Sequence, residues 1–525
     1  MVIFMTGMVV AQNTATTNQE GNNNSGTQIQ TGDDNNATIH QGDFKGTGTN
    51  MDVQNQGVAV QNQTGDENSA LIQQRSGSWG TGNTSTQTQV GDKNTASMTF
   101  FNGQNLSTQI QTGMDNWSYG QISQSNNMIT TNQNGDRNWA KARLLNSDES
   151  EAMIQQVGAD NKGEVYATGF NNEAKINQNG NMHDAYQMQN GMNNKAVSNT
   201  GLFFNAEETS TEQYQTGDGN LSRFEMQKGY RNDAKSDQDG DNNHVFYRVR
   251  GNDNSAEFMQ ESYSPGNVAS AVTKGDDNVI EVEQLGTNNM VGAHYPAGGT
   301  GIEQDGDRNE TYIKQEGSDN FATVDQMGTE NILGYDVFGY NNHMEAVQED
   351  EGNGNGNMAI IDQTWFDKEN YGNEIFLTQR TNGGAGNRAY MKLKGDENEF
   401  NVTQTGSWNQ VVGKGMFPDV AFDDVTDGDM FKYEGDKSDI DFTQAGNQNL
   451  ISGAIHNSYG EVMVDQQGNV NKSFINVGPG LKFHNDVTIN QWGNYNLGNV
   501  MQMSNGNAAV INQMGNSNTS TISQQ

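Results

Sequence analysis

The chain has 525 residues, a length that in an ordinary globular protein would form several domains. Only 32% of the residues are hydrophobic, and the net charge is −37, which excludes a conventional large apolar core and disfavours binding to nucleic acid or to anionic membranes. The chain contains no cysteine, so disulfides and thiolate metal sites are excluded.

The first eleven residues differ from those that follow. Met1 to Val10 are mostly apolar, and Ala11 and Gln12 come next. This pattern is typical of the end of a signal peptide cleaved near Ala11, here without its basic segment; the alternative is an apolar N-terminal strand. No stretch reaches the roughly 20 apolar residues of a transmembrane helix. We expect residues 1–11 to be a truncated signal peptide and residues 12–525 to form one continuous repetitive domain.

Turn-forming residues recur along the rest of the chain. The sequence Gly-Asp-x-Asn stands at residues 65–68, 91–94, 135–138, 217–220 and 395–398. Glycine adopts a positive φ without steric cost, and Asn or Asp side chains bond to nearby backbone groups. These segments therefore predict tight turns between short strands.

Residues 172–180 contain one complete repeat unit, Asn-x-Ala-x-Ile-x-Gln-x-Gly. Side chains of a strand alternate between its two faces, so Asn172, Ala174, Ile176 and Gln178 share one face. The residues between them are mostly polar, here and in other units, which predicts that the opposite face meets water. The strand is about 6–7 residues long, which is a usual length.

The clearest periodicity lies between residues 304 and 348, where Gly306, Gly317, Gly328 and Gly339 are each 11 residues apart. One such unit supplies one strand and one turn. We expect two units, about 22 residues, to close one rung of a flattened coil. The predicted fold class is all-β, a cross-β-like β-solenoid with two sheets.

The predicted inward face carries Asn and Gln, which demands an explanation. A buried amide without partners costs roughly 1–3 kcal/mol. In a solenoid the same amide recurs about 4.8 Å away in the next rung, so that side-chain amides bond to one another along a ladder. Ala and Ile or Val fill the remaining space between the sheets. The repeat therefore predicts structural ladders, in keeping with the low apolar content.

This unit resembles the curlin repeat of bacterial curli fibres, whose motif is approximately Gln-x-Gly-x-x-Asn-x-Ala-x-x-x-Gln. The motif is complete at four places, and partial matches cover most of residues 19–518. The structural ladder predicted from these matches consists of Gln30, Gly32, Asn35, Ala37, Gln41, Gln63, Gly65, Asn68, Ala70, Gln74, Gln227, Gly229, Asn232, Ala234, Gln238, Gln315, Gly317, Asn320, Ala322, Gln326, Gly328 and Asn331.

The resemblance implies a secreted, cell-surface structural protein that forms or nucleates curli-like amyloid fibres, or pili, for adhesion and biofilm matrix. It also implies an outer-membrane export machinery as a partner. We expect end-to-end self-association, because the open ends of a solenoid offer unpaired strand edges, and we expect no cofactor. This chain departs from the family in being much longer than typical curlin subunits. Its repeat is also irregular, and we expect insertions near residues 290–299 and 411–439.

The histidines and the turn aspartates are candidate metal ligands, but each set also has a simpler structural interpretation. None of the seven histidines shows a metal-binding spacing, and His183 occupies an Asn position of the repeat, so we expect it to replace a ladder amide. Stacked turns would align carboxylates for Ca²⁺. We favour solvated turns, because the calcium-binding solenoid repeat has a different glycine pattern. The turn carboxylates concerned are Asp66, Asp92, Asp136, Asp218, Asp241, Asp276 and Asp307.

The alternative to a fibre protein is a monomeric solenoid adhesin or a polysaccharide- or ice-binding module. Such a module needs a flat face with one residue type on many rungs. Thr84, Thr86 and Thr88 give one short threonine row, and the outward positions are otherwise heterogeneous. A β-helical enzyme would need carboxylates clustered around a groove, and nothing in the sequence identifies them. We therefore expect a structural protein and not an enzyme.

Overall fold

The computed structural model describes most of the chain, and it separates into two compact units that are treated one at a time. Unit 1 lies within Met1–Asp241 and unit 2 within Asn242–Gln525. The described residues are 12–20, 23–42, 56–75, 82–201, 206–262, 264–292, 301–350, 356–363, 370–382, 384–413, 426, 429–456, 458–478 and 484–524. The predicted signal peptide, residues 1–11, lies outside them.

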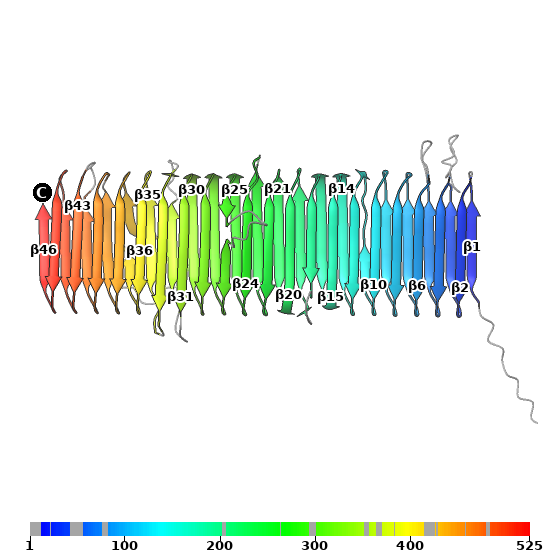
Figure 1. Cartoon of the computed structure of the whole chain (residues 1–525), viewed down its shortest axis with the longest axis horizontal. Coiled ribbons are helices and arrows are strands. Elements are labelled where there is room, and N and C mark those ends of the chain that lie inside the picture. The colour runs from blue at the N-terminus through cyan, green and yellow to red at the C-terminus, as the bar shows by residue number, and fades with distance from the viewer. Residues whose placement is uncertain are drawn as a thin grey trace, which may run out of the picture. The chain divides into compact units, whose positions relative to one another are not determined.

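Unit 1 consists of two sheets of parallel strands, sheet 1A and sheet 1B (Figure 1). Sheet 1A contains β1 (Thr14–Gln19), β3 (Asn36–Gln41), β5 (Ser69–Gln74), β7 (Thr95–Phe100), β9 (Trp117–Ile122), β11 (Trp139–Lys141), β12 (Ser147–Asp148), β14 (Lys162–Phe170), β16 (Asp184–Met192), β19 (Ser210–Thr216) and β21 (Asp233–Gly240). Sheet 1B contains β2 (Ser25–Thr31), β4 (Val58–Thr64), β6 (Thr84–Val90), β8 (Leu106–Thr112), β10 (Met128–Asn134), β13 (Glu151–Val157), β15 (Glu173–Asn181), β17 (Lys195–Thr200), β18 (Ala206–Glu207) and β20 (Leu221–Tyr230).

Unit 2 is built in the same way from sheets 2A and 2B. Sheet 2A contains β23 (Ser255–Ser262), β25 (Val279–Thr287), β28 (Glu310–Ser318), β30 (Ile332–Tyr340), β32 (Met358–Gln363), β33 (Asn370–Tyr371), β35 (Arg388–Lys394), β37 (Gln410–Val412), β38 (Phe431–Glu434), β40 (Leu450–His456), β42 (Lys472–Val477), β44 (Leu497–Gln502) and β46 (Thr519–Gln524). Sheet 2B contains β22 (His244–Arg250), β24 (Val268–Lys274), β26 (Met290–Val291), β27 (Ile302–Asp305), β29 (Phe321–Met327), β31 (His343–Asp350), β34 (Glu374–Thr381), β36 (Glu399–Thr405), β39 (Asp439–Ala445), β41 (Glu461–Gln467), β43 (Asp486–Trp492) and β45 (Ala508–Met514).

The pairing register confirms the predicted rung of two strands. Each long strand pairs in parallel with the next strand of its own sheet, so that Thr14 pairs with Asn36 and Glu151 with Glu173. The described residues contain no helix, and 67% of the chain is strand, in about 19 turns of roughly 23 residues. The average rung is longer than the predicted 22 residues because some rungs contain inserted residues, as between Thr31 and its partner Thr64. The all-β, two-sheet solenoid is therefore confirmed.

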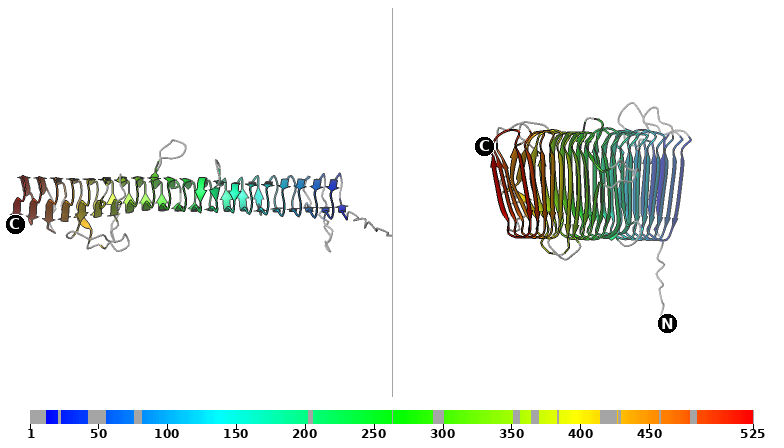
Figure 2. Two further views of the ribbon diagram at one scale, coloured as in Figure 1. Left: turned by 90° about the horizontal axis from the view of Figure 1, so that it is seen from below. Right: turned by 60° about the vertical axis from the view of Figure 1, so that its left-hand side comes forward.

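The predicted alternation of faces is clear in the burial of β15. Ala174, Ile176 and Gln178 are buried between the two sheets, whereas Glu173 and Lys175 are partly exposed on the outside. Within each unit the sheets form two flat layers, seen edge-on in Figure 2. Side chains of both layers share the narrow space between them, and this space is the core.

One part of unit 2 departs from the prediction that outward residues meet water. Met358, Tyr390, Val412 and Leu450 stand at outward positions of sheet 2A, yet they belong to a buried apolar cluster with Met430. Alternation along a strand predicts the direction of a side chain but not whether another part of the protein covers it.

The predicted insertions are narrower than expected. Met290 and Val291 form β26. In the segment 411–439, β37 extends to Val412 and β38 spans Phe431–Glu434, and both pair in register with β35 and β40. Residues 293–300, 414–425 and 427–428 lie outside the described part of the chain. No helix in the described ranges is long and apolar enough to span a membrane.

Candidate functional site: the stacked amide ladders

Many of the described rungs turn on a Gly-x-x-Asn segment. In the turn after β8, Gly113 has a φ of 115° and Asp115 a φ of 56°. A Cβ atom on Gly113 would lie 2.1 Å from the carbonyl oxygen of Gly135 in the next rung. Both the positive φ and the close approach of the stacked turns therefore require glycine at this position.

The asparagine that ends each turn forms the first ladder. Asn116 Nδ2 donates to Asn94 Oδ1 at 3.0 Å and to the Gly135 carbonyl oxygen at 2.6 Å. The backbone N–H of Asn116 donates to the same Asn94 oxygen at 3.2 Å, and Asn138 repeats this pattern on Asn116. One side chain thus connects three successive rungs and satisfies its own buried amide.

The glutamine that ends each inward run forms the second ladder. In sheet 1B, Nε2 of each glutamine donates to Oε1 of the next at 2.8 or 2.9 Å, through Gln30, Gln63, Gln89, Gln111, Gln133, Gln156 and Gln178. The second N–H of the amide crosses to the opposite sheet: Gln133 donates to the Trp117 carbonyl oxygen at 3.0 Å and Gln156 to the Trp139 carbonyl oxygen at 2.9 Å. The ladder therefore joins rungs along the axis and joins the two sheets.

The two ladders have opposite polarity. In the bonds between side chains, asparagine amides donate toward lower residue numbers, as Asn116 does to Asn94, whereas glutamine amides donate toward higher residue numbers, as Gln111 does to Gln133. The same glutamine direction appears in unit 2, where Gln284 donates to Gln315 at 2.9 Å and Gln326 to Gln348 at 2.8 Å. If all side-chain amides pointed the same way, their dipoles would add along the axis of the solenoid. Because the two ladders point in opposite directions, their dipoles offset each other.

The structure places the sequence-predicted residues in three sets. Buried amide positions hold Asn35, Asn68, Asn232, Asn320, Asn331, Gln41, Gln63, Gln74, Gln238, Gln315 and Gln326, with Gln30 partly exposed in the same column. Ala37, Ala70, Ala234 and Ala322 are buried between the sheets. Gly32, Gly65, Gly229, Gly317 and Gly328 lie in turns with positive φ.

Gln227 is the exception and corrects one predicted ladder residue. Gln178 pairs with Thr200, and Thr200 with Met226, so Met226 holds the glutamine position in β20. Gln227 instead lies near Glu225, with 3.5 Å between Nε2 and Oε2. The strand has one more residue between Asn220 and Gly229 than the repeat requires, and spacing to the glycine alone misled the assignment.

A further glutamine column was not predicted. In β2, β4, β6 and β8 the position of Ile or Val is taken by glutamine, and Gln28 donates to Gln61, Gln61 to Gln87 and Gln87 to Gln109 at 2.7 to 2.9 Å. The sequence signal was present, since these strands read Gln-x-Gln, with both glutamines on one face.

His183 stands in the asparagine ladder as predicted. Its backbone N–H donates to Asn161 Oδ1 at 3.1 Å, and its ring Nδ1 lies 2.7 Å from the hydroxyl of Thr209. The side chain is 1% exposed. Burial lowers the pKa of His183 to about 4, against an opposing contribution from the backbone oxygens of Asn179 and Ala206. The neutral imidazole therefore replaces an amide.

The turn carboxylates accept backbone hydrogen bonds from the preceding rung. Asp66 Oδ1 accepts from the N–H of Asp33 at 2.8 Å, and Asp92 Oδ1 accepts from the N–H of Asp66 at 2.8 Å. The same bond is made by Asp136, Asp218, Asp241, Asp276 and Asp307. In the described ranges, no group of three or more His, Asp or Glu side chains is arranged to hold a metal ion.

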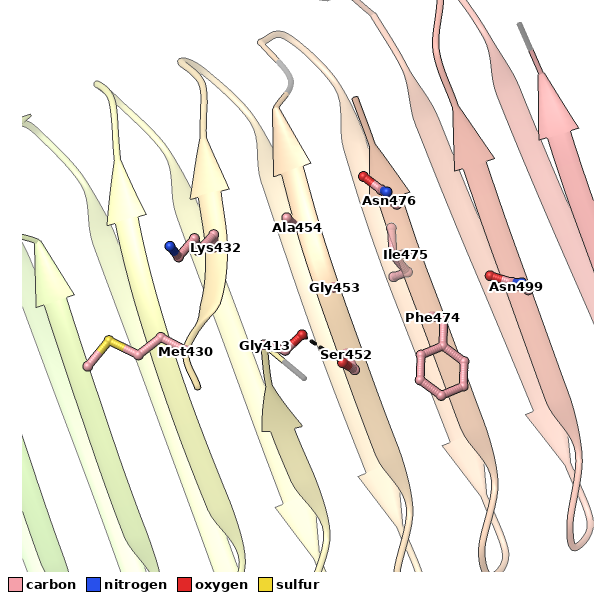
Figure 3. A pocket seen from close by; sticks show the side chains of 10 residues that line it. All are labelled: Gly413, Met430, Lys432, Ser452, Gly453, Ala454, Phe474, Ile475, Asn476 and Asn499. Atoms are coloured by element: carbon pink, nitrogen blue, oxygen red, sulfur yellow. Dashed lines mark hydrogen bonds between the residues drawn. The ribbon is translucent and has the colours of Figure 1, made fainter. Parts of the chain in front are cut away.

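A cavity of about 560 Å³ lies on the outer face of sheet 2A. Figure 3 shows Met430 and Phe474 beside it, over Gly453, with the Ser452 hydroxyl donating to the Gly413 carbonyl oxygen at 3.0 Å. Lys432 is the one charged side chain among the described lining residues.

Comparison with known proteins identifies the repeat. A family model described as the curlin associated repeat matches residues 148–180 and 300–328. None of the curated proteins compared with the chain matches it. The four complete motifs found by eye include one within the second matched segment, and rungs of the same geometry are found outside both segments. The chain carries curlin associated repeats, consistent with a curlin repeat family protein.

Proposed function

We propose that this chain of curlin-type repeats is an extracellular structural protein whose rungs stack end to end into curli-like amyloid fibres for adhesion and biofilm matrix. The proposal requires no catalytic residue and no cofactor. Export through an outer-membrane machinery is part of it, on the strength of the family resemblance. The observation that carries the proposal is the state of the strands at the two ends of the described chain.

These terminal strands each have one unpaired edge within the described ranges. β1 pairs with β3 and β2 with β4, while β45 pairs with β43 and β46 with β44, and none of the four has a described partner on its other side. β1 and β46 bury no residue fully, unlike the strands next to them. Open edges of this kind template the addition of another strand.

The ladders make the two kinds of edge complementary. Gln19 and Gln30 donate to the following rung, so their Oε1 atoms face the N-terminal edge as acceptors. Gln524 accepts from Gln502 in the preceding rung and donates one amide hydrogen to the Ala508 carbonyl oxygen, so its second amide hydrogen remains for a rung beyond it. An N-terminal edge therefore fits a C-terminal edge and not a second N-terminal edge. Such a contact is head-to-tail and does not close, which favours filaments over dimers.

The test is assembly of the purified chain, followed by thioflavin fluorescence, electron microscopy and fibre diffraction. We expect seeded growth of filaments with a repeat of about 4.7–4.8 Å along the axis. A protein that stays monodisperse even when seeded would contradict the proposal while leaving the fold intact.

A variant of the N-terminal edge strand gives the matched control. Gln19→Lys places an ammonium at an inward position of β1, where a second chain would bury it without a partner, at a cost of several kcal/mol. Asn18→Lys places the same charge on the outward side of the same strand. We expect the first variant to stop elongation and the second to elongate like the unaltered chain.

A further inference from the structure

The outer face of the first five strands of sheet 1B carries no charge. It is formed by the outward residues, every second one, of β2, β4, β6, β8 and β10, and we refer to it as the neutral face. These strands contain no Asp, Glu, Lys or Arg at all. Charge returns in the next strand of the sheet, with Glu151 in β13, and then with Glu173 and Lys175 in β15. In a chain of net charge −37, this is an unusual surface.

The neutral face also exposes several large apolar side chains. Ile29 is 57% exposed, and Val58, Val90, Leu106 and Ile110 are 36 to 42% exposed. The outward residues of the same rungs on sheet 1A are uncharged as well, but none of them is among the exposed large hydrophobic residues. Exposed apolar side chains therefore gather on one side of these rungs only.

Threonines fill the middle of the face in register. Thr86, Thr108 and Thr130 pair with one another in successive strands, and Thr27 stands in the same column beyond Val60. Of the threonine row along β6 that the sequence revealed, only Thr86 therefore continues as threonine into the next strands, whereas Thr84 pairs with Leu106 and Thr88 with Ile110. Five strands about 4.8 Å apart and seven residues long give a flat area of roughly 500 Å².

We propose that the neutral face pairs with the neutral face of a second copy of this chain. Contact through charged surfaces brings like charges together, because the net charge is strongly negative. Of the two uncharged faces of these rungs, the neutral face is the one that also exposes large apolar side chains, so contact through it avoids the repulsion and buries apolar surface. Its alternating hydroxyl and methyl groups suit the dry interdigitation of two flat sheets about 10 Å apart. The contact is isologous, so it closes after two copies.

The area sets the strength of the contact. Roughly 1,000 Å² in total lies below the usual size of a stable interface, so two single chains pair weakly. Where the proposed end-to-end fibres form, each chain contributes one such face, and the many weak contacts add to a strong lateral pairing of two filaments. The pairing of filaments rests on the proposed function, whereas the weak dimer does not.

The test combines sedimentation velocity over a concentration series with electron microscopy of filaments. Thr86→Lys/Thr108→Lys places two charges at the centre of the neutral face. Met153→Lys/Val197→Lys places the same two charges on the same sheet and in the same column, on rungs that already carry charge. Melting temperatures of both variants establish that they fold.

We expect the unaltered chain and the Met153→Lys/Val197→Lys variant to form dimers that strengthen with salt, because salt screens the repulsion of the remaining surface. The Thr86→Lys/Thr108→Lys variant should dimerise at least tenfold more weakly and give single filaments where the other proteins give doublets. Equal dimerisation of all three proteins, or an unaltered chain that stays monomeric, would overturn the proposal. Retention of the unaltered but monomeric chain on a neutral polysaccharide such as cellulose would assign the face to that partner instead. Failure to form any filament, with dimers present, would count against the proposed function alone.

Discussion

Within unit 1, the two sheets treat the glutamine position differently. Sheet 1B fills it with an unbroken ladder from Gln30 to Gln178. Sheet 1A begins in the same way, with Gln19, Gln41 and Gln74. It then changes to apolar residues, among them Phe100, Ile122 and Ala167, which belong to one buried cluster, and it returns to Gln189, Gln215 and Gln238.

The point in sheet 1A where the glutamine ladder gives way to apolar residues shows what a ladder and an apolar stretch each require. Gln74 has no glutamine in the next rung, and its Nε2 donates to the backbone oxygens of Val58 and Asn83 instead. A rung therefore accepts either an amide or an apolar side chain at this position, provided that its neighbours match or the backbone supplies a partner. Which side chain fits at this position of the repeat therefore depends on the side chains at the same position in the neighbouring rungs.

The largest effect is expected from breaking the unbroken ladder. Gln156→Met keeps the side-chain volume but leaves Gln133 Nε2 and Gln178 Oε1 without their bonds. Each orphaned buried group costs roughly 1–3 kcal/mol, so the free energy of unfolding should fall by about 3 kcal/mol. Chemical denaturation measures it. The neighbouring Gln155→Met, on the exposed face of the same strand, should change it by less than about 0.5 kcal/mol.

The reverse substitution tests the apolar stretch of sheet 1A. Phe100→Gln offers Gln74 an acceptor, but its own amide hydrogens meet Ile122 in the next rung. Loss of the buried ring and an unsatisfied amide should lower the free energy of unfolding by about 2–3 kcal/mol. A stability equal to that of the unaltered chain would show that ladder continuity does not matter at this position.

His183 allows the ladder to be repaired. The pKa of His183 is about 4 in the folded chain and near 6.5 when unfolded, so the unfolded state binds the proton first as the pH falls. The contribution of His183 to stability is complete above pH 6.5 and is lost as the pH falls toward 4. His183→Asn should remove this loss, a gain of about 2 kcal/mol at pH 4.5 relative to pH 7.5. Unfolding curves of both proteins at the two pH values measure it, and an unchanged difference would contradict the buried imidazole.

Asp336 on sheet 2A should show the opposite pH dependence. Burial first, and then the nearby Asp362, raise the pKa of Asp336 to about 6, and its Oδ1 has no hydrogen-bond partner. The folded chain holds the proton longer than the unfolded chain, so stability is highest below pH 4 and falls as the pH rises through 6. Asp336→Asn should therefore raise the free energy of unfolding at pH 7 by roughly 3 kcal/mol, with little change at pH 4. A variant that is less stable at pH 7 would contradict this sign.

The strands and turns of a rung can be predicted from the sequence because three signals assign most residues in the same way. These signals are the 11-residue period, the turn-forming residues and the alternation of inward and outward side chains. Asn172, Ala174, Ile176 and Gln178 illustrate this agreement. It fails at Gln227, where one extra residue before the glycine shifts the register and only strand pairing reveals that Met226 lies inside. The sequence also cannot reveal the opposed polarity of the ladders, which depends on amide orientation in space.

The outward surface was harder to predict for a related reason. Thr86, Thr108 and Thr130 are far apart in the sequence and become neighbours only through the register of the rungs. Reading along one strand therefore reveals a short row, and reading across strands reveals the neutral face.

The most direct test of the account is hydrogen exchange of glutamine side-chain amides in selectively ¹⁵N-labelled protein. Ladder glutamines such as Gln111 and Gln133 donate both amide hydrogens inside the molecule, whereas outward glutamines such as Gln155 lie at the surface. We predict that the ladder amides exchange at least a hundredfold more slowly than the outward ones. Equal rates for the two sets would contradict the claim that stacked amides hold the rungs together.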